Sequence, residues 1–250
     1  MSAGAGGRIG SAIVAAAAEA GATIGIITRN APDADRTVEE LQARGTKAAR
    51  AVADVEDEAA LVDAIARIGS ELGPIRHLVN VIGGAMGEYH AAAELPLAAV
   101  DKVVDRNLRY AIVSCREVGA ALLARGETGS IVNVSSPAGS GRPVIAAYSI
   151  AKAGLDSFSR SIALEWAPHG IRVNVLGCGA IRTGDQPRDV EQPTIPLRRR
   201  GEPEEVASGV VFLLSDLAAY TTGTTLYVDG GAFLGHPGGG ALSSMARQGR

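Results

Sequence analysis

Helix-like and strand-like segments alternate along the whole chain, and this alternation restricts its fold more than any other feature. Apolar residues at helical spacing predict helices, whereas short apolar runs bounded by glycine or polar residues predict buried strands. The predicted strands cover residues 23–28, 47–52, 77–82, 130–134, 171–176 and 224–228. The predicted helices cover residues 9–20, 35–44, 56–72, 96–125, 146–166 and 204–215. Strands that alternate with helices indicate the α/β class and a doubly wound parallel sheet with right-handed crossovers.

A length of 250 residues allows one large α/β domain or two small ones. We expect one domain over residues 1–234 and a flexible tail over residues 235–250, which begins with H-P-G-G-G. The long predicted helix 96–125 is expected to break near Gly119 or Gly126. Aromatic residues make up only 4% of the chain, so the core is expected to consist of Ala, Val, Ile and Leu.

Charge and cysteine content exclude several classes of function. The net charge of −3 gives no reason to expect a nucleic acid or an anionic membrane as a partner. No apolar run is long enough to predict a membrane span. Cys115 and Cys178 do not suggest a disulfide framework, which fits a reducing cytoplasm. The four histidines lack ligand spacing, so no metal site is predicted.

The first predicted helix follows a loop that contains Gly4, Gly6 and Gly7, and Gly10 lies in its first turn. Backbone amides of such a loop, together with the helix N-terminus, can hold a pyrophosphate, although a glycine-rich terminus can also be simply disordered. Arg8–Ala18 also imitates a signal peptide, but the same residues fit a helix after the loop.

A Rossmann-type dinucleotide fold requires a buried strand directly before its glycine loop. Only Met1, Ser2 and Ala3 precede the loop here, so we expect the usual first strand to be missing. Its loss would leave two buried strand edges without backbone partners, at about 1–3 kcal/mol for each group. We therefore expect either that the natural protein begins earlier or that another segment fills the slot.

Tyr148 and Lys152 form Y-S-I-A-K, with Ser136 twelve residues upstream at the end of an apolar run. The i, i+4 spacing places the phenol and the amine on one face of a helix. An ammonium beside a phenol lowers the phenol pKa, which makes Tyr148 a candidate acid or base near neutral pH. Alone, Y-x-x-x-K more often marks an ordinary amphipathic helix.

In combination these motifs resemble the short-chain dehydrogenase/reductase family over nearly the whole chain, with closest similarity to its 3-oxoacyl-reductase-like branch. The glycine motif of that family corresponds to Ala3–Gly10, and its strand end N-N-A-G corresponds to Asn80–Gly83. The matches to its active-site residues are Asn107, Ser136, Tyr148 and Lys152. Later matches are I-R-V-N at 171–174, C-G-A-I-R-T at 178–183 and V-D-G-G at 228–231.

The resemblance implies an NAD(P)-dependent enzyme that transfers a hydride between its cofactor and a carbonyl or secondary alcohol. It implies that Ser136 and Tyr148 bind the substrate oxygen and that Tyr148 transfers the proton. Lys152 would lower the tyrosine pKa and bind the nicotinamide ribose, while Asn107 supports a water molecule. The cofactor-binding residues it implies, besides Tyr148 and Lys152, are Gly4, Gly6, Arg8, Ile9, Gly10, Arg29, Asp54, Val55, Asn80, Gly83, Gly179, Ile181 and Thr183.

The second predicted strand ends in Thr28-Arg29-Asn30 with no carboxylate at the turn. A carboxylate there would select NAD(H) by binding the ribose hydroxyls, whereas Arg29 offers a fork of donors to a 2′-phosphate. We therefore expect NADP(H) in preference to NAD(H), with Arg8 as a second positive charge. If Arg29 is instead a solvated turn residue, NAD(H) or both cofactors are allowed.

The lid between Thr183 and Pro196 is shorter than is usual in the family, which suggests an open site. Two other departures leave an alternative open, since Arg8 replaces a glycine and Ala3 lacks a hydroxyl. With the absent first strand, these two departures suit a non-catalytic module that binds a ligand or a protein. The complete Asn-Ser-Tyr-Lys set favours the enzyme. We expect a small-molecule substrate and, by resemblance, a homotetramer.

Overall fold

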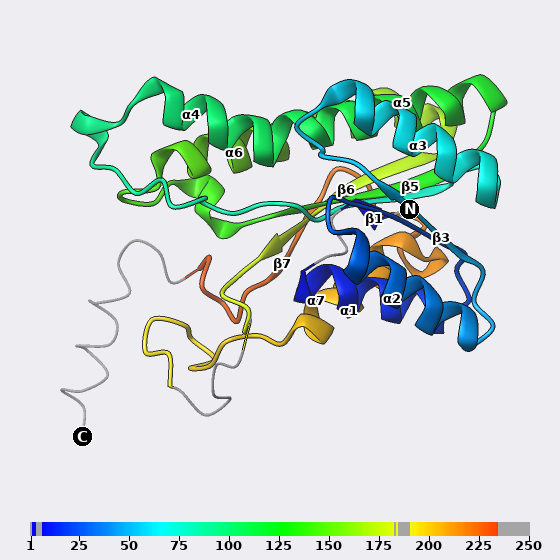
Figure 1. Ribbon diagram of the computed structural model, residues 1–250. Helices are drawn as coiled ribbons and strands as arrows, with labels where there is room; N and C mark the ends of the chain where they lie inside the picture. Colours follow the sequence, from blue (N-terminus) through cyan, green and yellow to red (C-terminus); the bar gives the residue numbers. More distant parts are fainter. Residues whose placement is uncertain (1, 4–6, 183, 185–190, 235–250) are drawn as a thin grey trace.

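The computed structural model describes residues 2–3, 7–182, 184 and 191–234. A parallel sheet of seven strands, in the order β3-β2-β1-β4-β5-β6-β7, passes through the middle of the molecule (Figure 1). The strands are β1 Ser2–Ala3, β2 Ile24–Thr28, β3 Ala48–Val52, β4 His77–Asn80, β5 Gly129–Ser135, β6 Ile171–Cys178 and β7 Thr225–Val228. The doubly wound parallel sheet predicted from the sequence is therefore confirmed.

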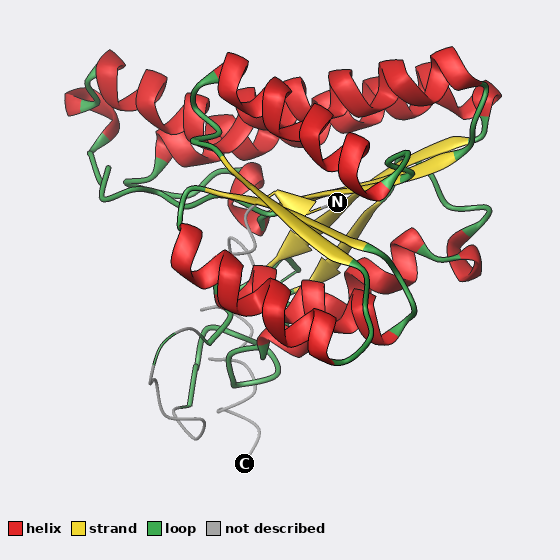
Figure 2. Ribbon diagram, turned by 45° about the vertical axis from the view of Figure 1, so that its right-hand side comes forward, coloured by secondary structure: helices red, strands yellow, loops and turns green. Residues whose placement is uncertain are grey.

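Helices cover both faces of the sheet (Figures 1 and 2). One layer contains α3 Glu58–Leu72, α4 Leu97–Val104, α5 Tyr110–Arg125 and α6 Ala146–Trp166. The other contains α1 Arg8–Glu19, α2 Ala31–Ala43 and α7 Pro203–Leu214. Among the residues that the structure describes, none of the helices has the length and apolar character needed to cross a bilayer.

The expectation that the first strand is missing is wrong. Ser2 and Ala3 form β1, which pairs in parallel with Ile26 and Ile27 of β2 and with Val79 and Asn80 of β4. Two residues before the glycine loop are thus enough to bridge the sheet centre. On the amino-terminal side of this pairing lies a cavity of about 430 Å³, whose mainly aliphatic lining includes Ile24.

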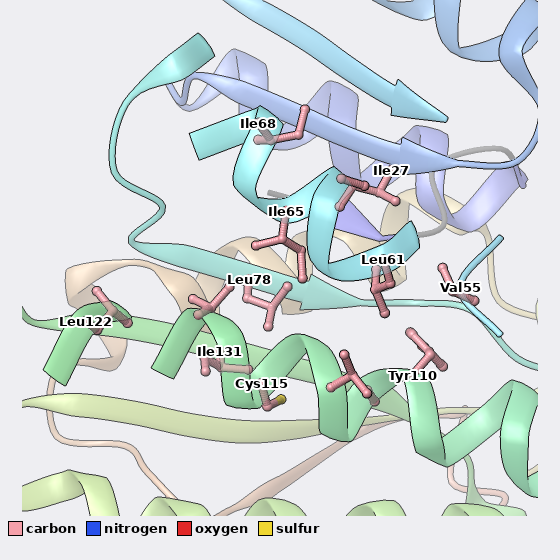
Figure 3. Close-up of a cluster of buried hydrophobic side chains, with 14 of the residues drawn as sticks. Ile27, Val55, Leu61, Ile65, Ile68, Leu78, Tyr110, Cys115, Leu122 and Ile131 are labelled. Carbon is pink, nitrogen blue, oxygen red and sulfur yellow. The ribbon is translucent and has the colours of Figure 1, made fainter. Parts of the chain in front are cut away.

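The main hydrophobic core lies between the sheet and the layer of α3 and α5 (Figure 3). Leu61 and Ile65 point from α3 toward the side of Leu78 and Ile131, whereas Ile68 points away from them and lies against Gly25 of β2. Aliphatic residues provide most of this packing, as the low aromatic content predicts, and each fully buried aliphatic side chain contributes about 1.5–3 kcal/mol. This rigid layer fixes the strand ends that carry the site.

Two of the predicted helices differ from the structure by more than a shift of one or two residues at an end. α2 begins at Ala31 rather than at residue 35, because the Asn30 side chain caps it by accepting from the Asp33 N–H at 3.4 Å. The long helix 96–125 is interrupted at Asp105–Arg109, where the backbone forms a π-helical turn, and not at Gly119. A π turn widens the helix without any glycine, so no local sequence signal marks it.

Gly119 is instead a packing residue of α5. A Cβ at this position would overlap the Trp166 ring, lying 2.7 Å from Cζ3 and 2.9 Å from Cζ2. Trp166 is itself buried at the end of α6, so the ring has little freedom to move. The absent side chain allows α5 and α6 to pack closely.

We predict that Gly119→Ala lowers the free energy of unfolding by about 1–2 kcal/mol, because overpacking outweighs the gain in helix propensity. Gly69→Ala is the matched control, since it lies inside α3 and its nearest neighbour, Ile75 Cδ1, is 4.0 Å away. That variant should be stabilised by up to about 1 kcal/mol. Urea denaturation of both variants is the measurement, and equal effects would contradict the packing role of Gly119.

Candidate functional site

The predicted site residues follow the carboxyl ends of neighbouring strands. Arg29 follows β2, Gly83 lies three residues beyond β4, and Ser136 follows β5. Because all strands are parallel, these ends share one edge of the sheet, which is where doubly wound folds bind ligands. Helix α6 brings Tyr148 and Lys152 to the same edge.

Tyr148 and Lys152 occupy the first two turns of α6, as their spacing predicts. The Lys152 Nζ lies 5.7 Å from the centroid of the Tyr148 ring. Lys152 is only 2% exposed, and its amine donates a hydrogen bond to the Val134 carbonyl of β5 at 3.0 Å. The lysine therefore ties the helix of the tyrosine to the strand that leads to Ser136.

Burial controls the protonation of both groups. It raises the pKa of Tyr148 to about 12, although a hydrogen bond with Ser136 acts in the opposite direction. It lowers the pKa of Lys152 to about 8, since the charged ammonium loses its hydration, while the nearby Asp156 carboxylate partly offsets this. Desolvation is thus the largest effect on the phenol, and the lowering of the tyrosine pKa by Lys152 stays a prediction.

Asn107 lies in the π turn and is completely buried. Its side-chain oxygen accepts the Gly84 N–H at 2.9 Å, and its amide donates to the carbonyls of Gly84 at 3.0 Å and Val103 at 2.9 Å. A Cβ on Gly83 would lie 2.8 Å from the Asn107 Oδ1 and 2.9 Å from the Lys152 Nζ. Asn107 and Lys152 thus converge on a backbone position that only glycine can occupy.

The hydroxyl of Tyr110 holds the loop after β4 from the side of the hydrophobic core. Tyr110 is the first residue of α5 and belongs to the main core (Figure 3). Its hydroxyl donates to the Ile82 carbonyl and accepts the Ile82 N–H, both at 2.9 Å. The chain at residues 82–84 is therefore held on one side by Tyr110 and on the other by Asn107.

A second part of the site is a cavity of about 310 Å³ at the ends of β2 and β3. Its lining includes Gly7, Thr28, Arg29, Asn30, Asp54, Val55, Ile82, Gly83 and Arg106. Arg29 is 62% exposed, and its Nη1 lies 3.6 Å from the Asp54 Oδ2. Arg29, Asp54 and Val55 are thus placed together, as the sequence predicts, and Gly83 connects this cavity to Lys152.

Other predicted cofactor residues are placed differently. The Asn80 side chain is buried and donates to the Asn133 Oδ1 at 2.8 Å, so it serves the interior of the sheet. Arg8 starts α1 and is exposed, and it is not among the described residues that line the cavity with Arg29. Ile9 and Gly10 follow it in the first turn of α1.

The remaining predictions concern the loop after β6 and the chain ends. Gly179 packs against the Asp229 backbone with no space for a side chain, and Ile181 is buried and pairs with Gly201. Gly4, Gly6 and Thr183 lie outside the described residues, as do the expected tail 235–250 and most of the short lid.

Arg106 is a charged residue of the cavity beside Arg29 that no sequence pattern had indicated. It precedes Asn107 in R-N-L, and this position beside a predicted active-site residue was the only available signal. Its Nη1 lies 2.7 Å from the Glu56 Oε1 and 3.8 Å from the Asp54 Oδ1. The π turn therefore presents two consecutive side chains to the site, Arg106 at its outer end and Asn107 at Lys152.

These residues fit a nicotinamide dinucleotide. The cavity beside Arg29 and Asp54 offers polar partners to an adenosine, and the glycine at position 83 leaves room for a flat group beside Lys152. No group of three or more potential ligand residues is placed to hold a metal ion within the described ranges. The arrangement suits hydride transfer in which Tyr148 handles a proton.

We predict that Lys152 makes folding stability depend on pH in the alkaline range. Its pKa falls from an ordinary 10.5 to about 8 on folding, so between these values the unfolded chain binds a proton that the folded chain does not. The destabilisation is fully present below pH 8 and disappears as the pH rises toward 10.5.

The test compares urea denaturation of the wild type and of Lys152→Met at pH 7 and pH 10. The wild type should gain about 2–3 kcal/mol relative to the variant, since each pKa unit corresponds to about 1.4 kcal/mol. The variant itself is expected to be the more stable protein at pH 7. Stability differences that do not change with pH would contradict a buried, desolvated amine.

Comparisons with known proteins agree with this geometry. A family model described as enoyl-(acyl carrier protein) reductase matches residues 4–232. Galactitol 2-dehydrogenase (L-tagatose-forming) of Cereibacter sphaeroides is 38% identical over 239 residues, covering 91% of this chain and 92% of that protein. L-Rhamnose 1-dehydrogenase (NAD(P)(+)) of a Sphingomonas species is 33% identical over 236 residues, covering 90% and 92% of the two chains.

Solved structures agree as well. A variant of actinorhodin polyketide ketoreductase with NADPH superposes with a TM-score of 0.84 at 29% identity, covering 92% of this chain and 95% of that one. The chain belongs to the short-chain dehydrogenase/reductase family, and it is an NAD(P)-dependent oxidoreductase that acts on alcohol or carbonyl groups.

Proposed function

We propose that the protein interconverts a ketone and a secondary alcohol, with NADP(H) as its preferred cofactor. The observation that carries this proposal is that Asn107 and Lys152 meet at Gly83, while Lys152 lies beside Tyr148 and Tyr148 is hydrogen-bonded to Ser136. The relatives named as sugar and polyol dehydrogenases and the ketoreductase neighbour support a small oxygenated substrate.

Reduction of a ketone needs a hydride on carbon and a proton on oxygen. The cofactor supplies the hydride when it is bound. The Ser136 and Tyr148 hydroxyls donate hydrogen bonds to the substrate oxygen and so fix its position. Tyr148 then gives its proton to that oxygen, and the alcohol is complete.

The high tyrosine pKa suits this direction, since a phenol with a pKa of about 12 keeps its proton until the oxygen becomes basic. Lys152 lies close enough to stabilise the phenolate that forms. Because its own pKa is about 8, the amine can gain or lose a proton near neutral pH. In the oxidative direction the same groups take the proton from the alcohol.

The preference for NADP(H) rests on Arg29. The turn after β2 carries Thr28, Arg29 and Asn30, and the Asn30 side chain is used as the cap of α2. The exposed Arg29 guanidinium is then the group at this turn suited to a phosphate dianion. Arg8, at the start of α1, adds positive charge to the same edge of the sheet.

Assembly and compartment are part of the same proposal. A homotetramer is expected from the family resemblance, and exposed apolar residues such as Leu164 on α6 and Leu217 after α7 are suited to subunit contacts. A cytoplasmic location fits the two free, buried cysteines. We also infer that residues 1–234 form one domain.

Tyr148→Phe should lower kcat by about 10²–10⁴-fold, because it removes the proton donor while retaining the ring. Cofactor binding, followed by fluorescence titration, should change much less. Tyr89→Phe is the matched control, since that hydroxyl lies on a side chain that is 65% exposed. Wild-type turnover of the Tyr148 variant on a confirmed substrate would show that another group supplies the proton.

Arg29→Ala should weaken NADPH binding by about 10–100-fold, as expected for a charge-assisted contact of about 1.5–3 kcal/mol. NADH binding should change little. Arg36→Ala removes the same charge from α2, where Arg36 pairs with Asp33 at 2.9 Å, and should leave both affinities unaltered. If NADH binds the wild type more tightly than NADPH, the preference for NADP(H) is wrong.

A further inference from the structure

The cavity beside Arg29 contains a second guanidinium that differs from Arg29 in its anchoring. The Arg106 side chain is 16% exposed, and its Nη1 donates a hydrogen bond of 2.7 Å to the Glu56 Oε1. Arg29 is 62% exposed and lies 3.6 Å from its nearest carboxylate oxygen. Arg106 is therefore held firmly in one position, whereas Arg29 is loosely attached.

Both guanidinium groups approach the same carboxylate. Arg29 faces the Asp54 Oδ2 at 3.6 Å, and Arg106 faces the Asp54 Oδ1 at 3.8 Å. The positive charge of Arg106 repels Arg29 and so partly cancels the attraction between Asp54 and Arg29. Arg106 thus offsets the negative charge that would otherwise hold Arg29 and repel an incoming phosphate.

The net charge of the side chains around the cavity decides whether they attract or repel a 2′-phosphate. Arg29 and Arg106 together balance Asp54 and Glu56, so the four side chains sum to zero. Without Arg106 they would sum to −1, and a phosphate dianion would meet net repulsion. A cofactor that carries a hydroxyl at the same position is far less sensitive to this change.

We propose that Arg106 is a specificity-determining residue that favours the 2′-phosphorylated cofactor by neutralising Asp54 and leaving Arg29 available. This inference rests on the proposed NADP(H) preference. The π turn then has two roles, because Arg106 acts on cofactor choice while the neighbouring Asn107 contacts the loop beside Lys152. Arg106 acts through Asp54 and Arg29, so it is a positioning residue.

The test measures the affinities of NADPH and NADH for the wild type, Arg106→Gln and Arg106→Lys by fluorescence titration. Arg106→Gln should reduce the ratio of NADPH to NADH affinity by about 3–10-fold at low salt, and less at high salt because the charges are partly exposed. Arg106→Lys should restore most of the ratio. Glu56→Gln should move the ratio in the opposite direction.

Arg109→Gln is the matched control. Arg109 lies in the same π turn, is 64% exposed and faces Asp105 and Glu58, which are not among the described residues lining the cavity. The Arg109→Gln substitution removes the same charge and should leave the ratio of NADPH to NADH affinity unchanged. An equal shift in this variant would mean that Arg106 has no special position.

The outcomes separate this inference from the proposal on which it rests. If Arg29→Ala leaves NADPH affinity intact, the phosphate assignment itself fails. If Arg29→Ala weakens NADPH but Arg106→Gln leaves the ratio unchanged, only the role of Arg106 is overturned. A loss of affinity that is equal for both cofactors would likewise overturn it, because Arg106 would then support the site only structurally.

Discussion

The site depends on the burial of the Lys152 amine between β5 and α6. A charged group with 2% exposure is costly, and the single hydrogen bond to the Val134 carbonyl is its described protein partner. This bond and the contact with the Tyr148 ring place the amine at the point where β5 and α6 meet. The lowered pKa of the amine is the direct result of its burial, and the same desolvation raises the pKa of the tyrosine.

The π turn at Asp105–Arg109 connects the two halves of the site. Without this widening the helix would continue straight from α4 into α5. The turn places Asn107 under the loop after β4 and Arg106 in the cavity beside Arg29. Tyr110, which directly follows the turn, anchors it in the hydrophobic core. Rigid packing thus reaches both the part of the site at Lys152 and the cavity beside Arg29.

Sequence patterns predicted the parts of the fold that depend on local periodicity. The helix 146–166 was predicted with its observed bounds, and Tyr148 and Lys152 share the predicted face. Patterns failed where partners distant in sequence decide the structure: β1 needs only two residues because β2 and β4 hold it from both sides. The role of Gly119 depends on Trp166, and that of Arg106 on Asp54 and Glu56, so neither was visible locally. Burial of Tyr148, which raises its pKa, was likewise not visible, because spacing reveals charge proximity but not burial.

The proposed reduction of ketones with NADPH can be tested on the protein itself. The most direct measurement incubates the protein with NADPH, and separately with NADH, against a panel of ketones and keto-sugars while the absorbance of the reduced cofactor is followed. The account predicts that absorbance falls with at least one ketone and falls faster with NADPH. The proposal would be contradicted if NADPH bound tightly but no ketone of the panel oxidised it, and if the protein also oxidised no alcohol with NADP+.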